Sequence, residues 1–143
     1  MRIIIDGDAC PNIKEIALLA KENNMETIIF IDTNHLIACE YATIITVDYT
    51  SQNVDVHIIN KIIKGDLVIT NDYGLAAICI GKGAKVISFN GFIYDSSNID
   101  GLLELKHLKM NLRKNKIRIK NIKKRTVEDC QNLLLSINKI IVE

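Results

Sequence analysis

Short apolar runs alternate along this chain with longer segments in which apolar residues recur at helical spacing. Five runs are rich in Ile or Val and are bounded by polar residues or Gly, which is typical of strands buried in a sheet. These predicted strands span residues 2–6, 27–32, 43–47, 67–70 and 85–89. Helical periodicity and capping residues predict helices over residues 11–23, 53–64, 73–80 and 98–111, and from 126 onwards. The alternation predicts an α/β fold, a three-layer Rossmann-like sandwich with a mainly parallel sheet of about five strands.

Length and composition indicate one domain with an aliphatic core. The chain has 143 residues, of which 48% are hydrophobic but only 5% aromatic, and a single domain over residues 1–143 fits the usual domain size. No apolar stretch approaches the length of a membrane span and no signal-peptide pattern is present, so we expect a cytoplasmic protein without a membrane partner. In a reducing compartment we expect free thiols at Cys10, Cys39, Cys79 and Cys130.

The net charge of +1 hides an uneven distribution along the chain. Residues 1–105 carry seven basic and fourteen acidic side chains, whereas residues 106–125 carry ten basic side chains and no acidic one. Such a run is often only a solvated surface, but its density favours contacts with the phosphates of RNA or single-stranded DNA. Because the run contains no aromatic residue, we expect backbone contacts without base stacking. The residues predicted to bind nucleic acid are Arg113, Lys114, Lys116, Lys123, Lys124 and Arg125.

Acidic residues gather where two of the predicted strands end. Asp6 and Asp8 come at the end of the first strand, Asp72 follows the fourth, and Asp55 lies in the first turn of the helix before that strand. Because these positions meet at the carboxyl edge of a parallel sheet, we expect the four carboxylates to converge as candidate catalytic residues. Oxygen ligands suit Mg²⁺ or Mn²⁺, so Asp6, Asp8 and Asp72 are the predicted metal ligands, with Asp55 assisting.

These acids also have a plainer interpretation. Asp residues after strands commonly form turns and helix caps, and for Asp8, Asp55 or Asp72 taken alone capping is at least as common as metal binding. Asp32 lies at the same edge, but nothing in the sequence directs it inward, so it is left out of the predicted site. Asp66 begins the fourth strand and therefore belongs to the opposite edge, where a turn residue is expected.

Three stretches of the chain carry a family resemblance. They are Ile5-Asp6-Gly7-Asp8-Ala9-Cys10-Pro11, Gly65-Asp66-Leu67-Val68-Ile69-Thr70-Asn71-Asp72, and the run over residues 83–94. Together they resemble the bacterial YaiI/YqxD family, also called UPF0178 or DUF188, over nearly all of the chain to about residue 111. That family is grouped with PIN-like, NYN-related domains, whose nuclease members hold Mg²⁺ or Mn²⁺ with acidic residues at the carboxyl edge of the sheet. The resemblance implies Asp6, Asp55 and Asp72 as the matching acids, while Asp8 belongs to the family's own DxDACP motif.

The chain departs from the family pattern in three places. Gln52 stands where many members carry a further acid, which thins the acidic cluster, and Asn90 stands where an Arg is often found before Gly91. From Lys116 to Arg125, Lys-rich sequence replaces a stretch that contains Gly and Pro in the family.

Together these features predict a hydrolase, a Mg²⁺- or Mn²⁺-dependent nuclease that acts on RNA or single-stranded nucleic acid. One competing class is a non-catalytic RNA-binding or regulatory PIN-like module, in which the acids only cap helices. Another is a phosphatase of the haloacid dehalogenase type, which would use Asp6 and Asp8 after the first strand. Against that class, Cys10-Pro11 follows the acids and the chain has no room for a cap domain. The oligomeric state stays open at the level of sequence.

Overall fold

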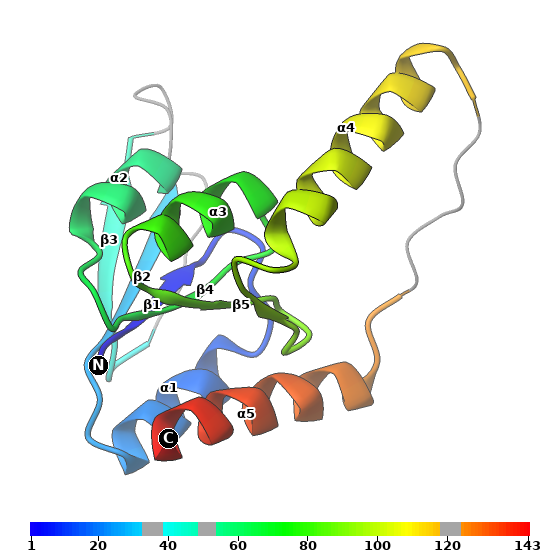
Figure 1. Cartoon of the computed structure of the whole chain (residues 1–143). Helices are drawn as coiled ribbons and strands as arrows, with labels where there is room; N and C mark the ends of the chain where they lie inside the picture. Colours follow the sequence, from blue (N-terminus) through cyan, green and yellow to red (C-terminus); the bar gives the residue numbers. More distant parts are fainter. Residues whose placement is uncertain (33–38, 49–53, 118–123) are drawn as a thin grey trace.

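A computed structural model describes residues 1–32, 39–48, 54–117 and 124–143. Its strands form a sheet with the order β3-β2-β1-β4-β5-β6 (Figure 1). The strands are β1 (Ile3–Asp6), β2 (Thr27–Asp32), β3 (Thr43–Val47), β4 (Leu67–Ile69), β5 (Lys85–Ile87) and β6 (Ile93–Tyr94). The helices found in the described residues are α1 (Ile13–Glu22), α2 (Val54–Lys61), α3 (Tyr73–Gly81), α4 (Ile99–Lys114) and α5 (Val127–Val142).

The sheet is parallel except at one edge. β1 pairs in parallel with both β2 and β4, so the two acid-bearing strands β1 and β4 are neighbours at the centre of the sheet. β6 pairs antiparallel with β5, with Tyr94 opposite Val86. This sixth strand is absent from the sequence prediction because two residues are too few to show a period. The turn before β6 uses Gly91 at a φ of 83°, a conformation that favours glycine.

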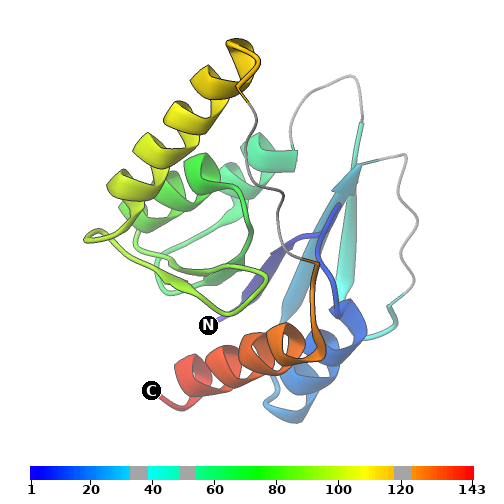
Figure 2. The same ribbon diagram turned by 90° about the vertical axis from the view of Figure 1, so that its right-hand side faces the viewer.

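Alternate residues of the central strands point to opposite faces and bury two separate cores. Ile4 and Val68 pack on one face against α2, α3 and the start of α4. Ile3 and Ile69 pack on the other face against α1 and α5, which lie side by side away from α2 and α3 (Figure 2). The predicted α/β class and the three-layer Rossmann-like arrangement are therefore confirmed, with six strands instead of about five.

The helix boundaries differ from the prediction at α1, α2 and α4, and α2 ends at Lys61 instead of residue 64. α1 begins at Ile13 and not at Pro11, because Asn12 adopts a left-handed conformation with a φ of 60°. α4 continues to Lys114, and its C-terminal half extends away from the rest of the protein (Figure 1). The apolar residues of this half are not buried in the core; Leu108, for example, is 55% exposed.

Some predictions fall on residues outside the described parts of the chain. They include the start of the second predicted helix at residue 53, the family departure at Gln52, and residues 118–123 of the basic run. Just before this last segment, the N–H of Ile117 donates to the carbonyl of Leu112 at 2.9 Å and closes α4.

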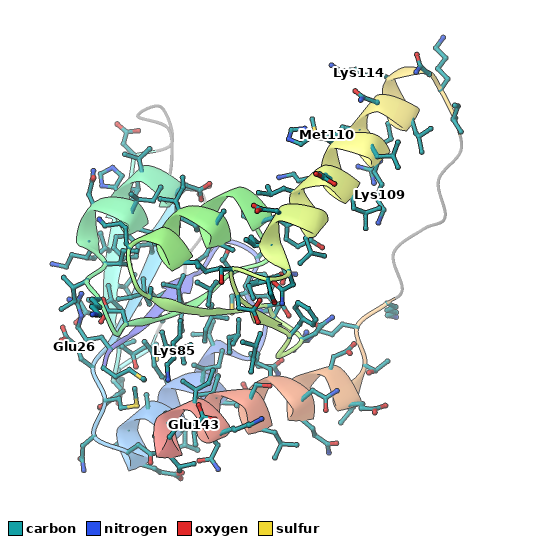
Figure 3. The ribbon with its side chains drawn as sticks, in the orientation of Figure 1. Glu26, Lys85, Lys109, Met110, Lys114 and Glu143 are labelled. Atoms are coloured by element: carbon teal, nitrogen blue, oxygen red, sulfur yellow. The ribbon has the colours of Figure 1, made fainter. Side chains whose placement is uncertain are left out.

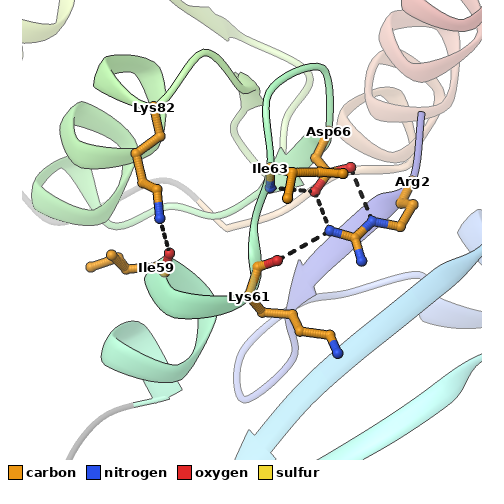
Figure 4. Close-up of polar contacts among 6 residues, drawn as sticks. All are labelled: Arg2, Ile59, Lys61, Ile63, Asp66 and Lys82. Carbon is orange, nitrogen blue, oxygen red and sulfur yellow. Dashed lines mark hydrogen bonds and ion pairs between the residues drawn. The ribbon is translucent and has the colours of Figure 1, made fainter.

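The amino edge of the sheet is held by a buried ion pair. The guanidinium of Arg2 donates to both carboxylate oxygens of Asp66, at 2.6 and 3.1 Å, and to the carbonyl of Lys61 at 3.1 Å (Figure 4). The N–H of Ile63 donates to the same carboxylate at 2.9 Å. Asp66 is only 2% exposed, so it supports the turn between α2 and β4. Its place at this edge agrees with its exclusion from the predicted site.

All four cysteines are free in the structure, as expected from their spacing. Cys79, on the buried face of α3, lies in the core, and the other three are half-buried. Within the described ranges, no helix is both long and apolar enough to cross a membrane.

Candidate functional site

The predicted acids come together at the carboxyl edge of the sheet. Asp6 is the last residue of β1, Asp72 lies just after β4, and Asp55 occupies the first turn of α2. The charges of Asp8 and Asp72 act on the carboxyl group of Asp6, and those of Asp72 and Asp6 act on Asp55. The sequence prediction that these four side chains converge agrees with this mutual influence.

A short hydrogen-bond chain links β1 to the start of α3. The hydroxyl of Thr70 donates to Oδ2 of Asp6 at 2.9 Å and accepts the backbone N–H of Asp72 at 3.0 Å. Thr70 has no exposed surface, so this hydroxyl has a fixed place in the site. Sequence reasoning missed Thr70 because a Thr at the end of a strand is ordinary. Its position directly before Asn71-Asp72 was the available signal.

Asp72 caps α3, as the plainer interpretation of this residue predicted. Its Oδ1 accepts the backbone N–H groups of Gly74 at 2.8 Å and Leu75 at 3.2 Å. The same oxygen lies 3.9 Å from the ammonium nitrogen of Lys106 on α4. Asp72 thus combines a structural role with a position between the acidic residues and the basic helix.

Burial, together with the closeness of the carboxylates, raises the pKa of two of them. For Asp6, burial and the charges of Asp8 and Asp72 raise the pKa, while the hydrogen bond from Thr70 opposes them. Burial, the charges of Asp72 and Asp6, and a hydrogen bond with Asp72 raise the pKa of Asp55 to about 6. Lys106 opposes that rise. Carboxylates that repel each other in this way are stabilised by a proton or a cation.

Three of the four predicted acids line a pocket of about 230 Å³, whereas Asp72 is not among its lining residues. Besides Asp6, Asp8 and Asp55, its wall includes two acids that the sequence prediction left out, Asp32 and Asp48. We call it the acidic pocket; its lining residues are Asp6, Asp8, Asp32, Val47, Asp48, Val54 and Asp55.

Asp32 reaches the acidic pocket because β2 is the neighbour of β1 in the sheet. Its backbone N–H donates to Oδ1 of Asp8 at 2.9 Å. Gly7 allows this approach, since a Cβ there would lie only 2.7 Å from the side chain of Ile29. The sequence prediction left Asp32 out of the site because sequence alone does not show that β2 pairs with β1.

The donor chemistry of the acidic pocket fits a hard divalent cation, which prefers carboxylate oxygens. However, in the described part of the chain no three His, Cys, Asp or Glu side chains lie together closely enough to hold a metal ion. A bound ion would therefore require the side chains to reorient. The assignment of Asp6, Asp8 and Asp72 as Mg²⁺ or Mn²⁺ ligands stays a prediction.

The six basic residues predicted to bind nucleic acid have different surroundings. Lys114, Lys116 and Lys124 are exposed, whereas Arg113 lines a groove beside α4. Arg125 is half-buried and donates to Oδ1 of Asn90 at 2.6 Å and to Oδ1 of Asn12 at 3.1 Å. Lys123 lies outside the described residues.

Cys10 sits beside the acidic pocket but is a poor nucleophile. Its thiol donates to the carbonyl of Pro11 at 3.4 Å. Burial and the negative charge of Asp6 raise the pKa of Cys10 to about 12, so the thiol stays protonated at neutral pH.

A family model described as "Uncharacterized BCR, YaiI/YqxD family" matches residues 4–143 of the chain. The chain belongs to the YaiI/YqxD family. A UPF0178 protein of Clostridium kluyveri is 44% identical over 142 residues, which cover 99% of this chain and 93% of the relative. A UPF0178 protein of Clostridium tetani is 43% identical over 143 residues, covering 97% of this chain and 98% of the relative. No solved structure matches the chain.

Membership of the YaiI/YqxD family confirms the resemblance found in the sequence motifs. The further relationship to PIN-like domains stays a prediction. Since the descriptions of the relatives name no reaction, the chemistry of the site has to be argued from its residues.

Proposed function

We propose that this YaiI/YqxD protein is a Mg²⁺- or Mn²⁺-dependent nuclease that hydrolyses RNA or another single-stranded nucleic acid at the acidic pocket. One observation carries the proposal. The ammonium group of Lys106 lies 3.9 Å from Oδ1 of Asp72, so the basic helix α4 meets the acidic residues. A site that cleaves a polyanion needs both parts, because carboxylates alone repel the phosphates of the substrate.

The four predicted acids have distinct parts in this proposal. Asp6, Asp8 and Asp72 would hold the ion, with Asp55 assisting. Such an ion, when bound, lowers the pKa of a water molecule and stabilises charge on the phosphoryl oxygens. Thr70 fixes the orientation of Asp6 through its 2.9 Å hydrogen bond, and Lys106 attracts the phosphate toward the pocket.

Cleavage of a single-stranded RNA in Mn²⁺ tests the proposal. The wild type should cleave it, chelation should stop cleavage, and Asp6→Asn should lower the rate by at least about a hundredfold, as removal of a charge-stabilising group does in other enzymes. Glu26→Gln is the matched control, because Glu26 is exposed at the other edge of the sheet (Figure 3). Equal rates for wild type and Asp6→Asn would refute the assignment of the site.

A second function is favoured by the hydrogen bonds that the acids already make. Asp72 caps α3 and Asp8 accepts the N–H of Asp32, as expected if the acids have structural roles in a non-catalytic binding module. Such a module would bind single-stranded RNA but leave it intact in Mn²⁺. A parallel assay with a generic phosphomonoester tests the phosphatase alternative. A phosphatase would hydrolyse that ester and leave RNA intact.

A further inference from the structure

A groove of about 690 Å³ runs between α4 and the strands β5 and β6, next to the acidic residues. We call it the α4 groove. It combines cationic, aromatic and amide side chains from three separate parts of the chain. Its lining residues are Asn71, Tyr73, Ser88, Asn90, Phe92, Tyr94, Leu102, Leu105, Lys106, Lys109, Met110 and Arg113.

One wall of the α4 groove is cationic. Lys106, Lys109 and Arg113 follow each other at three- and four-residue steps on α4, so they share one face of the helix. Lys109 and Met110 extend from the part of α4 that projects beyond the sheet (Figure 3). No acidic residue occurs between residues 105 and 114. Among the described residues, the ion pair recorded for this wall joins Lys106 to Asp72, so Lys109 and Arg113 add positive charge to the groove.

The opposite wall is aromatic. The rings of Tyr73 and Tyr94 meet edge to face with centroids 5.8 Å apart, and those of Phe92 and Tyr94 do so at 5.5 Å. Tyr94 is buried between them, whereas Phe92 is 51% exposed. Phe92 thus has a supported ring with free surface in the groove. These rings come from outside the basic run and reach it only in the fold, so the expectation of contacts without base stacking, which considered the run alone, stays a prediction.

Hydrogen bonds from backbone N–H groups to two side chains hold the aromatic wall in place. The hydroxyl of Ser88 accepts the N–H groups of Asn90 at 3.1 Å and Phe92 at 3.0 Å. Oδ1 of Asn71 accepts the N–H of Phe89 at 2.8 Å, which ties the residue before Asp72 to the end of β5. The groove is therefore preorganised and reaches the acidic residues at Asn71 and Lys106.

We propose that the α4 groove binds a single-stranded nucleic acid, stacking one base on Phe92 while Lys106, Lys109 and Arg113 hold the flanking phosphates. This inference rests on the proposed function in that the bound strand is taken to be the substrate of the acidic pocket. Alternating cations and an exposed ring match the alternating phosphates and bases of a flexible strand. A duplex keeps its bases stacked inside and would leave the ring of Phe92 without a partner.

Fluorescence anisotropy of the full chain with a labelled oligouridylate of about eight nucleotides, a length typical of such sites, tests the inference. The measurement is made with chelator present, so it needs neither a metal ion nor cleavage. An abasic oligomer of the same length supplies the phosphates without bases. Wild type should bind the oligouridylate about tenfold or more tightly than the abasic strand, the usual effect of stacking one base.

Two pairs of variants locate the contacts. Phe92→Leu keeps apolar volume but removes the ring, so it should weaken oligouridylate binding about tenfold and leave abasic binding unchanged. The triple variant Lys106→Gln, Lys109→Gln, Arg113→Gln should weaken both strands and reduce the salt slope by about 2, since each lost phosphate contact removes about 0.7. The matched control, Lys14→Gln, Lys21→Gln, Lys139→Gln, loses the same charge from exposed positions on α1 and α5, on the other face of the sheet, and should change the slope far less.

Several outcomes would overturn the inference. They are equal affinity for the two strands, an unaffected Phe92→Leu variant, equal slopes for the two triple variants, or equally tight binding of polyglutamate, which would mean that any polyanion suffices. Thermal unfolding of each variant shows whether it is folded. If RNA is not cleaved but base-dependent binding remains, the nuclease proposal is refuted and the proposal for the α4 groove stands. The two proposals can therefore fail separately.

Discussion

Lys106 on α4 and Asp72 at the start of α3 bring the two oppositely charged regions of this protein together, with Nζ and Oδ1 3.9 Å apart. The two residues are far apart in the sequence, and each belongs to a helix that packs on the same face of the sheet. Because α4 begins directly after β6, the short antiparallel strand determines where the basic helix leaves the sheet. The contact therefore depends on the hairpin that also supplies Phe92.

The first prediction concerns the electrostatic effect of Lys106. Lys106→Gln should raise the pKa of Asp55 further above about 6, because Lys106 opposes the effects that raise it. The ion pair is well exposed, at 46% and 37% for the two side chains, so the free energy of unfolding should fall by no more than about 1 kcal/mol. NMR titration of the carboxyl carbon of Asp55 and urea unfolding measure the two effects. Lys114→Gln is the control, and an unchanged pKa of Asp55 in Lys106→Gln would contradict the prediction.

The second prediction is a pH-dependent effect of Asp55→Asn on stability. The pKa of Asp55 is raised from 3.8 to about 6 in the folded protein. The folded state therefore binds the proton more tightly, and the stability from this group is present at low pH and is lost as pH rises through about 6. Asn carries no charge, so Asp55→Asn should be more stable than wild type at neutral pH. The difference should shrink as pH falls toward about 4.

Thermal unfolding of both proteins across that pH range checks the second prediction. A difference in Tm that stays constant with pH would show that Asp55 is not destabilised by its neighbours. Asp55→Asn at neutral pH also imitates the protonated state without lowering the pH of the rest of the protein.

The third prediction tests the hydroxyl of Thr70. Thr70→Val keeps the shape but leaves the N–H of Asp72 and Oδ2 of Asp6 without this partner. Because Thr70 is fully buried, the free energy of unfolding should fall by about 1–3 kcal/mol. The pKa of Asp6 should rise, since the hydrogen bond from Thr70 lowers it.

Thr70→Ser separates the two effects of the third prediction. Serine keeps the hydroxyl but loses a methyl group, so it should lose about 1 kcal/mol from packing while the pKa of Asp6 changes little. Urea unfolding measures the stability of the variants and carboxyl-carbon NMR follows Asp6. If Thr70→Val leaves the pKa of Asp6 unchanged, the hydroxyl does not act on the acidic pocket.

The acidic edge could be predicted from the sequence because it follows from local signals. Asp6 ends an apolar run, and Asp72 separates another from a helical segment. In a parallel sheet such ends share one edge, so the sequence pattern suffices without knowledge of the strand order. Asp32 shows the limit, because its place in the pocket depends on β2 pairing with β1, which no local pattern specifies.

The α4 groove could not be predicted because its parts have no local signature. Phe92 and Tyr94 belong to a loop and a two-residue strand, which show no hydrophobic period. Lys106 and Arg113 looked like members of an undivided basic run, although only one side of α4 faces the rings. Helix length mattered as well, since a helix ending at residue 111 would have left Arg113 outside it.

The last prediction concerns Arg125, which the sequence analysis grouped with the basic residues predicted to bind nucleic acid. Its guanidinium joins Asn90 before β6 to Asn12 before α1, at 2.6 and 3.1 Å. Arg125→Gln should therefore lower the free energy of unfolding by about 1–2 kcal/mol, the contribution of hydrogen bonds from a charged donor. The salt slope of oligouridylate binding should stay unchanged, because the guanidinium is engaged within the protein.

Arg125→Lys distinguishes geometry from charge in this contact. Lysine keeps the positive charge but lacks the planar fork that reaches two acceptors. The Arg125→Lys variant should therefore be destabilised almost as much as Arg125→Gln. Urea unfolding and anisotropy titrations at several salt concentrations give both readouts for the two variants. A full recovery of stability in Arg125→Lys would show that charge alone matters. A salt slope reduced by about 0.7 in Arg125→Gln would instead return Arg125 to the nucleic-acid contacts.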